Sequence, residues 1–172
     1  KTSLLLGAQY YPQRSVGDAQ IGSFSTWGAG VQADLAHGPL AVQVYYTQTG
    51  RGYDTQAPFG THASYLSLMI ADFNTAGEKG WGISADVDFA GLGVRGLTAS
   101  ATYASGSDRI DSADGSTLPN RSETDVRVDY AIGKGTFLEG LVATFRYAWL
   151  EQDGSPHTQT QLRAYLNYAV RF

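Results

Sequence analysis

Charged side chains occupy every second position of several apolar segments in this sequence. In residues 123–130, Asp125, Arg127 and Asp129 alternate with Val126 and Val128. Side chains at alternate positions of a β-strand share one face. The same phase predicts one charged face made of Asp34, Asp86, Asp88, Glu123, Asp125, Asp129, Arg127, Arg146, Arg163 and Arg171. Fixed charges along an aqueous passage can select which ions pass, so this pattern favours selection of solutes over catalysis.

Catalytic and metal-binding chemistry lacks the residues that it needs. The chain has no cysteine, which excludes thiol nucleophiles, disulfide scaffolds and cysteine metal sites. Neither G-x-S-x-G nor H-E-x-x-H occurs, and the aspartates of residues 106–122 lack the spacing of a Ca²⁺ loop. These aspartates are Asp108, Asp111 and Asp114. The histidines, at His37, His62 and His157, are scattered along the chain. We therefore expect no enzyme, no cofactor and no metal site.

The composition narrows the class of protein further. The 172 residues carry a net charge of −4, which argues against nucleic-acid binding because such domains usually show a clustered basic excess. Charged residues make up 16% of the chain and aromatic residues 12%, with 21 glycines. The longest apolar run, residues 66–71, is far shorter than the roughly 20 residues of a membrane-spanning helix. The remaining way for such a chain to cross a membrane is a β-barrel.

The dominant period of the sequence is two, which predicts strands. Eight segments show it, each close to the roughly 9–11 residues of a tilted transmembrane strand: 2–11, 23–35, 40–49, 80–90, 97–105, 123–133, 140–151 and 159–172. Short turns (36–39, 91–96, 134–139) alternate with longer polar connections (12–22, 50–79, 106–122, 152–158). This asymmetry is typical of outer-membrane barrels. We predict one all-β antiparallel transmembrane β-barrel domain over residues 1–172, with 50–79 as a single long excursion.

Aromatic residues and the last strand support a membrane location. Rings favour the membrane–water boundary, and we expect a girdle from Tyr10, Tyr11, Trp27, Tyr45, Tyr46, Trp81, Tyr103, Tyr130, Tyr147, Trp149 and Tyr168. A final strand that ends on an aromatic residue, with apolar residues at every second position before it, matches the signal read by the barrel assembly machinery. Here the expected signal is Leu166, Tyr168, Val170 and Phe172.

Several motifs, taken in order, resemble a known family. They are 36–40 (AHGPL), 72–81 (DFNTAGEKGW), 86–98 (DVDFAGLGVRGLT) and 124–126 (TDV). They are similar to stretches in the C-terminal part of OprD-type outer-membrane porins, which pass small carboxylates and related solutes. The resemblance implies an 18-stranded barrel of which this chain covers the last eight strands. The family's arginine ladder is reduced: Ser84, Thr102, Ser105 and Thr144 stand at ladder positions, and only Arg146 and Arg163 are basic.

These observations predict a porin of the bacterial outer membrane for passive diffusion of small polar solutes, with carboxylates as the class that the resemblance implies. The expected pore-lining residues are Asp86, Asp88, Asp125, Arg127, Asp129, Arg146 and Arg163. The expected partners are outer-membrane lipid and lipopolysaccharide, the barrel assembly machinery and a small-molecule solute. Missing strands of a larger barrel and a homo-oligomer both stay open as further partners. Two readings of the excursion that begins at 50–54 also stay open: a segment folded into the pore or a surface loop.

Two alternatives have different consequences. A self-closed eight-stranded barrel with a plugged interior would have a structural or adhesive role, and segment 2–11 would pair with segment 159–172. A soluble ligand-carrying barrel would reverse the two faces, with apolar side chains inside and Arg127 and Arg163 outside.

Overall fold

The computed structural model describes residues 1–19, 22–57, 60, 62–133 and 135–169. Its elements are β1 (Thr2–Arg14), β2 (Ser25–His37), β3 (Leu40–Thr49), β4 (Lys79–Asp88), the 3₁₀-helix η1 (Phe89–Leu92), β5 (Leu97–Ser107), β6 (Arg121–Ala131), β7 (Leu141–Gln152) and β8 (Gln159–Tyr168). Among the described residues, no helix has the length and apolar character needed to cross a membrane.

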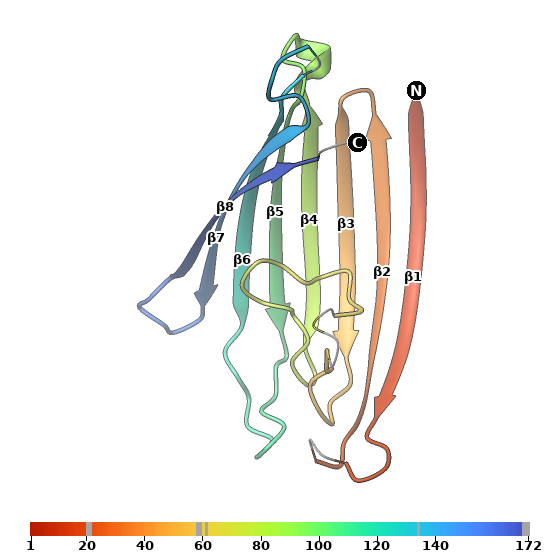
Figure 1. Ribbon diagram of the computed structural model, residues 1–172. Coiled ribbons are helices and arrows are strands. Elements are labelled where there is room, and N and C mark those ends of the chain that lie inside the picture. Colours follow the sequence, from red (N-terminus) through yellow and green to blue (C-terminus); the bar gives the residue numbers. More distant parts are fainter. Residues whose placement is uncertain (20–21, 58–59, 61, 134, 170–172) are drawn as a thin grey trace.

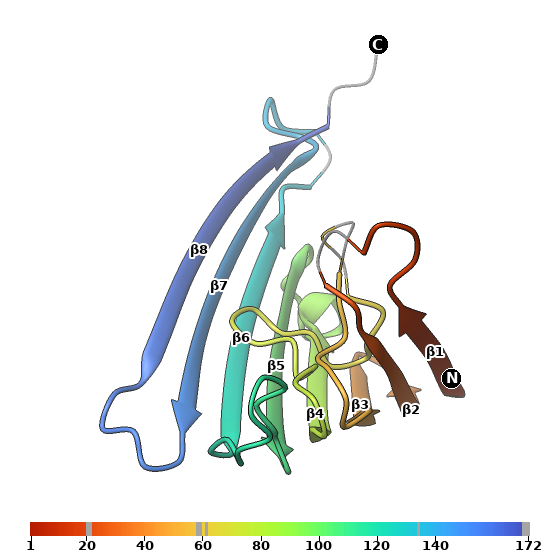
Figure 2. The same ribbon diagram turned by 90° about the horizontal axis from the view of Figure 1, so that it is seen from below.

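The eight strands form one antiparallel sheet in chain order (Figure 1). Seen from below, the strands follow an arc from β1 to β8 (Figure 2). Over the described residues, β1 pairs only with β2 and β8 only with β7, so the sheet is open. The alternative of a self-closed eight-stranded barrel is therefore wrong for this structure, because the arc leaves the two edge strands apart.

The predicted strands are confirmed, with small changes at their ends. β1 and β5 run on to Arg14 and Ser107. β4 ends at Asp88 rather than at residue 90, because the Asp88 carboxylate accepts a hydrogen bond from the Ala90 backbone N–H and caps η1. The described part of 50–78 contains no strand, which confirms that it is one excursion. It lies on the inner side of the arc (Figure 2).

The two faces of the sheet carry the side chains that the period predicts. Arg163 and Asp125 contact the excursion on the concave side, whereas their sequence neighbours on each strand face the other way. The convex face is apolar and exposed, with Leu4, Leu6, Tyr10, Val31, Leu35, Val44, Tyr46, Trp81, Ile83, Val128, Tyr130, Phe145, Leu162, Leu166 and Tyr168. An apolar exterior and a charged interior exclude the soluble barrel with reversed faces.

Two residues of the expected girdle face inward instead. The Tyr11 ring lies over Gly28 of β2, in the space that a side chain at Gly28 would fill. Tyr45 packs against the buried cluster under the excursion, and its hydroxyl is bonded to Gln43. Both sit next to an outward aromatic, Tyr10 or Tyr46, so only one residue of each Tyr-Tyr pair can reach the convex face.

The core lies between the excursion and the concave face. Leu66, Ala71 and Phe73 of the excursion pack with Ala104 of β5, and all four are buried. Small residues on the strands make room for them. A Cβ at Gly82 would lie 2.8 Å from the Leu66 Cδ2 atom, so a larger residue there would push Leu66 off the wall.

Candidate functional site

Three arginines form a row across the concave face. The register pairs Arg127 of β6 with Arg146 of β7, and Arg146 with Arg163 of β8. Because neighbouring strands lie about 4.8 Å apart, the backbone positions of these three arginines follow one another along one line across the sheet. The same line continues through Ser100 of β5 to Asp86 of β4. It therefore runs from an acidic end to a basic end.

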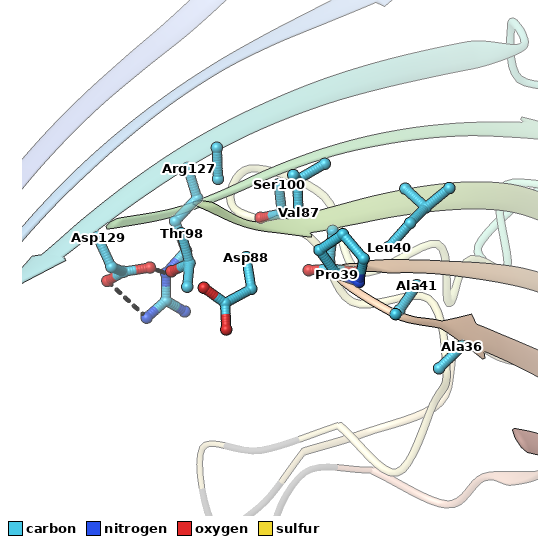
Figure 3. A pocket seen from close by; sticks show the side chains of 13 residues that line it. Ala36, Pro39, Leu40, Ala41, Val87, Asp88, Thr98, Ser100, Arg127 and Asp129 are labelled. Carbon is cyan, nitrogen blue, oxygen red and sulfur yellow. Dashed lines mark hydrogen bonds and ion pairs between the residues drawn. The ribbon is translucent and has the colours of Figure 1, made fainter. Parts of the chain in front are cut away.

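An open hollow of about 380 Å³ lies at the short-turn end of this face. Asp86, Asp88, Arg127 and Asp129 line it, and Asp88 points into the open space (Figure 3). Arg127 donates to Asp129 through Nε (2.6 Å) and Nη2 (3.0 Å). The Thr144 hydroxyl also bonds to Asp129. In this half of the face, Arg127 and Asp129 are paired with each other, the Asp88 carboxylate accepts from the Ala90 backbone N–H, and all three residues line a hollow that is open to water.

The other half lies under the excursion, and its charged groups bind backbone. Glu123 accepts hydrogen bonds from the backbone N–H groups of Ile70 and Ala71. Asp125 accepts one from Met69, and Arg163 donates to the Met69 carbonyl.

Contacts between charged side chains continue beside this region. The Arg146 Nη2 atom lies 3.5 Å from Asp125 Oδ2. Arg163 also donates to the Gln161 side chain. Arg146 and Arg163 thus lie at the border between the covered half and the open half.

A buried ion cluster holds the base of the excursion. Glu78 is fully buried and accepts from Arg121 through both carboxylate oxygens, at 2.9 and 2.8 Å, and from the Thr75 backbone N–H. Arg109 Nε lies 3.7 Å from Glu78 and has no hydrogen-bond partner within the described part of the chain. Burial, together with the nearby Arg121, lowers the pKa of Arg109. Arg121 also stacks over the Phe73 ring at 5.0 Å.

The other candidate groups do not converge. Within the described residues, no group of three His, Cys, Asp or Glu side chains could hold a metal ion. Asp108 pairs with Lys79 at 2.8 Å, Asp111 accepts from the Ala113 N–H, and Asp114 accepts from the Ser116 N–H. The histidines have separate surroundings: His37 bonds to Thr2, His62 to Asp72, and the His157 N–H to Ser155.

All seven residues expected to line the pore lie on the concave strand face. One expected ladder position does not: Ser105 pairs with Trp81 and so faces the convex side, because paired residues share a face. Leu166 and Tyr168 of the expected assembly signal are exposed on the convex face. The predictions for Val170, Arg171 and Phe172 concern residues outside the described part of the chain.

Sequence reasoning missed the ion cluster of Glu78, Arg109 and Arg121 as a functional unit. Its members fall in loops or at a strand end, where a period of two gives no information. The available signal was the motif 72–81, which contains Glu78 within Ala-Gly-Glu.

Comparison with known proteins identifies the family of this chain. The model of the family described as "OprD: outer membrane porin, OprD family" matches residues 1–172. The chain belongs to the OprD family of outer membrane porins. Its location is therefore the bacterial outer membrane. A comparison with curated proteins finds no match.

Solved structures of Pseudomonas aeruginosa porins have the same fold. OpdK with vanillate is 22% identical, with a TM-score of 0.87, and the match covers 97% of this chain and 44% of OpdK. OccK9 (OpdG) is 25% identical, with a TM-score of 0.87, and 97% and 42% of the two chains are covered. OprD is 23% identical, with a TM-score of 0.85, and 97% and 48% are covered.

The chain thus spans less than half the length of these OprD-family structures. Its open sheet matches the C-terminal part of their 18-stranded barrels. This match accounts for the curvature, because eight neighbouring strands of such a large barrel follow an open arc.

Proposed function

We propose that this sheet forms part of the wall of an outer-membrane channel through which small polar solutes diffuse passively. The row of Arg127, Arg146 and Arg163 on the concave face carries the proposal. Guanidinium groups bind carboxylates well because their paired N–H donors match the two oxygens. Solutes with a carboxylate group are therefore the favoured class. OprD-family membership supports a channel rather than an enzyme.

Selection by width comes from the excursion. It covers part of the concave face and packs on β4 and β5 through Leu66 and Phe73. A segment on the inner side of a barrel wall narrows the passage beside it. The excursion lies on the concave side of the sheet (Figure 2), which supports the reading of a segment folded into the pore. In the proposed channel, it restricts passage to small solutes.

Selection by charge comes from the open half. Arg127 is engaged by Asp129, and Arg163 by Met69 and Gln161. Among the residues that the structure describes, Arg146 has one distant partner, Asp125 at 3.5 Å. Its guanidinium therefore has the most free donors for a passing anion. Asp86 and Asp88 on β4 repel that anion and keep it near the arginine row.

The membrane setting implies further partners. Lipid covers the convex face, and lipopolysaccharide is the proposed partner at the long-loop end. The free edges of β1 and β8 present unpaired N–H and C=O groups, which hydrocarbon does not tolerate. We infer that further strands pair with both edges. The terminal signal of Leu166, Tyr168, Val170 and Phe172 is proposed to direct assembly by the barrel assembly machinery.

Neutralising the arginines tests the channel. Arg146→Gln and Arg163→Gln in the protein purified from outer membranes should each shift the reversal potential toward cation preference in planar bilayers under a salt gradient. Arg95→Gln, in the exposed turn before β5, should leave it unchanged. Unchanged reversal potentials in both wall variants would show that these arginines do not line the path. Absence of conductance in the native protein would overturn the proposed function.

A further inference from the structure

The tip of the excursion is held through its backbone by two acidic side chains of one strand. Three consecutive N–H groups, of Met69, Ile70 and Ala71, all donate to carboxylates of β6. Glu123 takes the last two at 2.7 Å each, one on each oxygen. Asp125, the next concave residue of the strand, takes the first at 3.1 Å.

Successive backbone N–H groups form a concavity that binds anions. Hydrogen bonds to an ionised carboxylate are stronger than neutral ones. Glu123 is fully buried, and Met69 and Ala71 are 6% and 5% exposed. Because the Met69 and Ala71 N–H groups are buried, losing their acceptors would leave buried donors without a partner. The hydrogen bonds to β6 thus depend on the carboxylates, whereas the Ala71 side chain packs separately with Leu66, Phe73 and Ala104.

The tip also holds itself together. The Leu68 N–H donates to the Ala71 carbonyl at 2.9 Å, which closes the turn. Arg163 of β8 donates to the Met69 carbonyl, so the tip is bound by β8 as well as by β6. The tip is therefore a closed turn held by charged groups of two strands.

The remaining contacts of the excursion fix other parts of it. The Glu78 cluster holds the base at Thr75 and Glu78. Leu66 and Phe73 pack on either side of the tip. Of the interactions at 69–71, those with charged side chains come only from β6 and β8 in the described part of the chain.

We propose that Glu123 is a positioning residue that sets the width of the channel. It holds residues 69–71 of the excursion against β6, and Asp125 and Arg163 bind the same segment. The role of Glu123 in channel width rests on the proposed function. The contact between Glu123 and residues 69–71 is independent of that function.

A thiol reporter tests the contact without requiring conduction. The chain has no cysteine, so Ala71→Cys gives a single thiol at a buried position of the tip. A charged methanethiosulfonate reagent should label it slowly. Adding Glu123→Gln replaces one acceptor oxygen by an NH₂ group that faces a backbone donor. The labelling rate should then rise about tenfold, as expected from the loss of a hydrogen bond to a charged group.

The same variants are measured in planar bilayers without the reporter. Glu123→Gln should raise single-channel conductance and admit larger solutes, whereas Glu123→Asp, which keeps a carboxylate, should restore most of both properties. Glu151→Gln, at the exposed end of β7, is the matched control and should change neither labelling nor conductance.

The outcomes distinguish a failure of the positioning role of Glu123 from a failure of the proposed channel function. Equal labelling of the Glu123→Gln and Glu151→Gln proteins would overturn the positioning role. Faster labelling in a protein that does not conduct in any form would support the positioning role and overturn the proposed function. If Glu123→Gln does not assemble, Asp125→Asn in the same reporter protein replaces it. A rise in its labelling rate supports the inference, and an unchanged rate contradicts it.

Discussion

Along β6, acidic residues of the concave face have different partners at the two ends of the strand. Glu123 is fully buried and binds the backbone of the excursion. Asp129, six residues later on the same face, lines the open hollow and pairs with Arg127 and Thr144. Glu123 and Asp129 are both carboxylates at concave positions of one strand, so the difference between them lies in what covers each residue.

This comparison separates two uses of a charged wall. In the covered half, a carboxylate orders a chain segment, and glycines such as Gly82 and Gly106 leave the room that the segment needs. In the open half, charges stay hydrated and can act on solutes. We therefore expect substitutions in the covered half to affect stability and pore width, and those in the open half to affect ion preference.

The largest expected effect is at Glu78 in the covered half. Glu78→Ala leaves Arg121 and Arg109 close together and buried without their counter-ion. Removing one member of a buried ion pair costs about 3–5 kcal/mol. We expect a loss of that order in the free energy of unfolding, measured by denaturant titration in lipid vesicles.

The matched variant is Asp86→Ala in the open half. Asp86 lines the hollow and makes no side-chain hydrogen bond or ion pair within the described residues. Its loss should change the free energy of unfolding by less than about 0.5 kcal/mol. Equal losses in the two variants would contradict the division of the wall into a covered and an open half.

The sequence predicted which side chains share a face but not which of them are covered. A period of two assigns Glu123 and Asp129 to the concave side equally well. What distinguishes them is the path of residues 50–78, which have no period and are placed by tertiary contacts such as Leu66 over Gly82. The Tyr11 and Tyr45 assignments were wrong because they rested on the preference of aromatic rings for the membrane–water boundary, whereas strand phase puts these two rings on the concave face.

A smaller effect is expected from Asp129→Asn in the open half. The change removes the charged partner of Arg127 and leaves its guanidinium free to face the solution. The reversal potential should move toward anion preference, opposite in sign to the effect of Arg146→Gln. Asp18→Asn, in the exposed turn after β1, is the control with the same loss of charge. A shift of the same size in the control would assign the effect to overall charge and not to the wall.

The smallest expected effect lies outside the spanning strands, at Asp108. A hydrogen bond and the charge of Lys79 lower the pKa of Asp108, and the Ser116 hydroxyl and N–H lower that of Asp114. A lowered carboxyl pKa means that the contact stabilises the fold above the ordinary value of about 3.9 and is lost as the pH falls through the lowered value. Lys79→Met should raise the pKa of Asp108 toward the ordinary value and leave that of Asp114 in place, as followed by NMR of aspartate-labelled protein in micelles. An unchanged Asp108 titration would show that the ion pair does not form in solution. A parallel rise at Asp114 would mean that the substitution disturbs the whole segment between β5 and β6, which would then be less independent of β4 than its own turn contacts indicate.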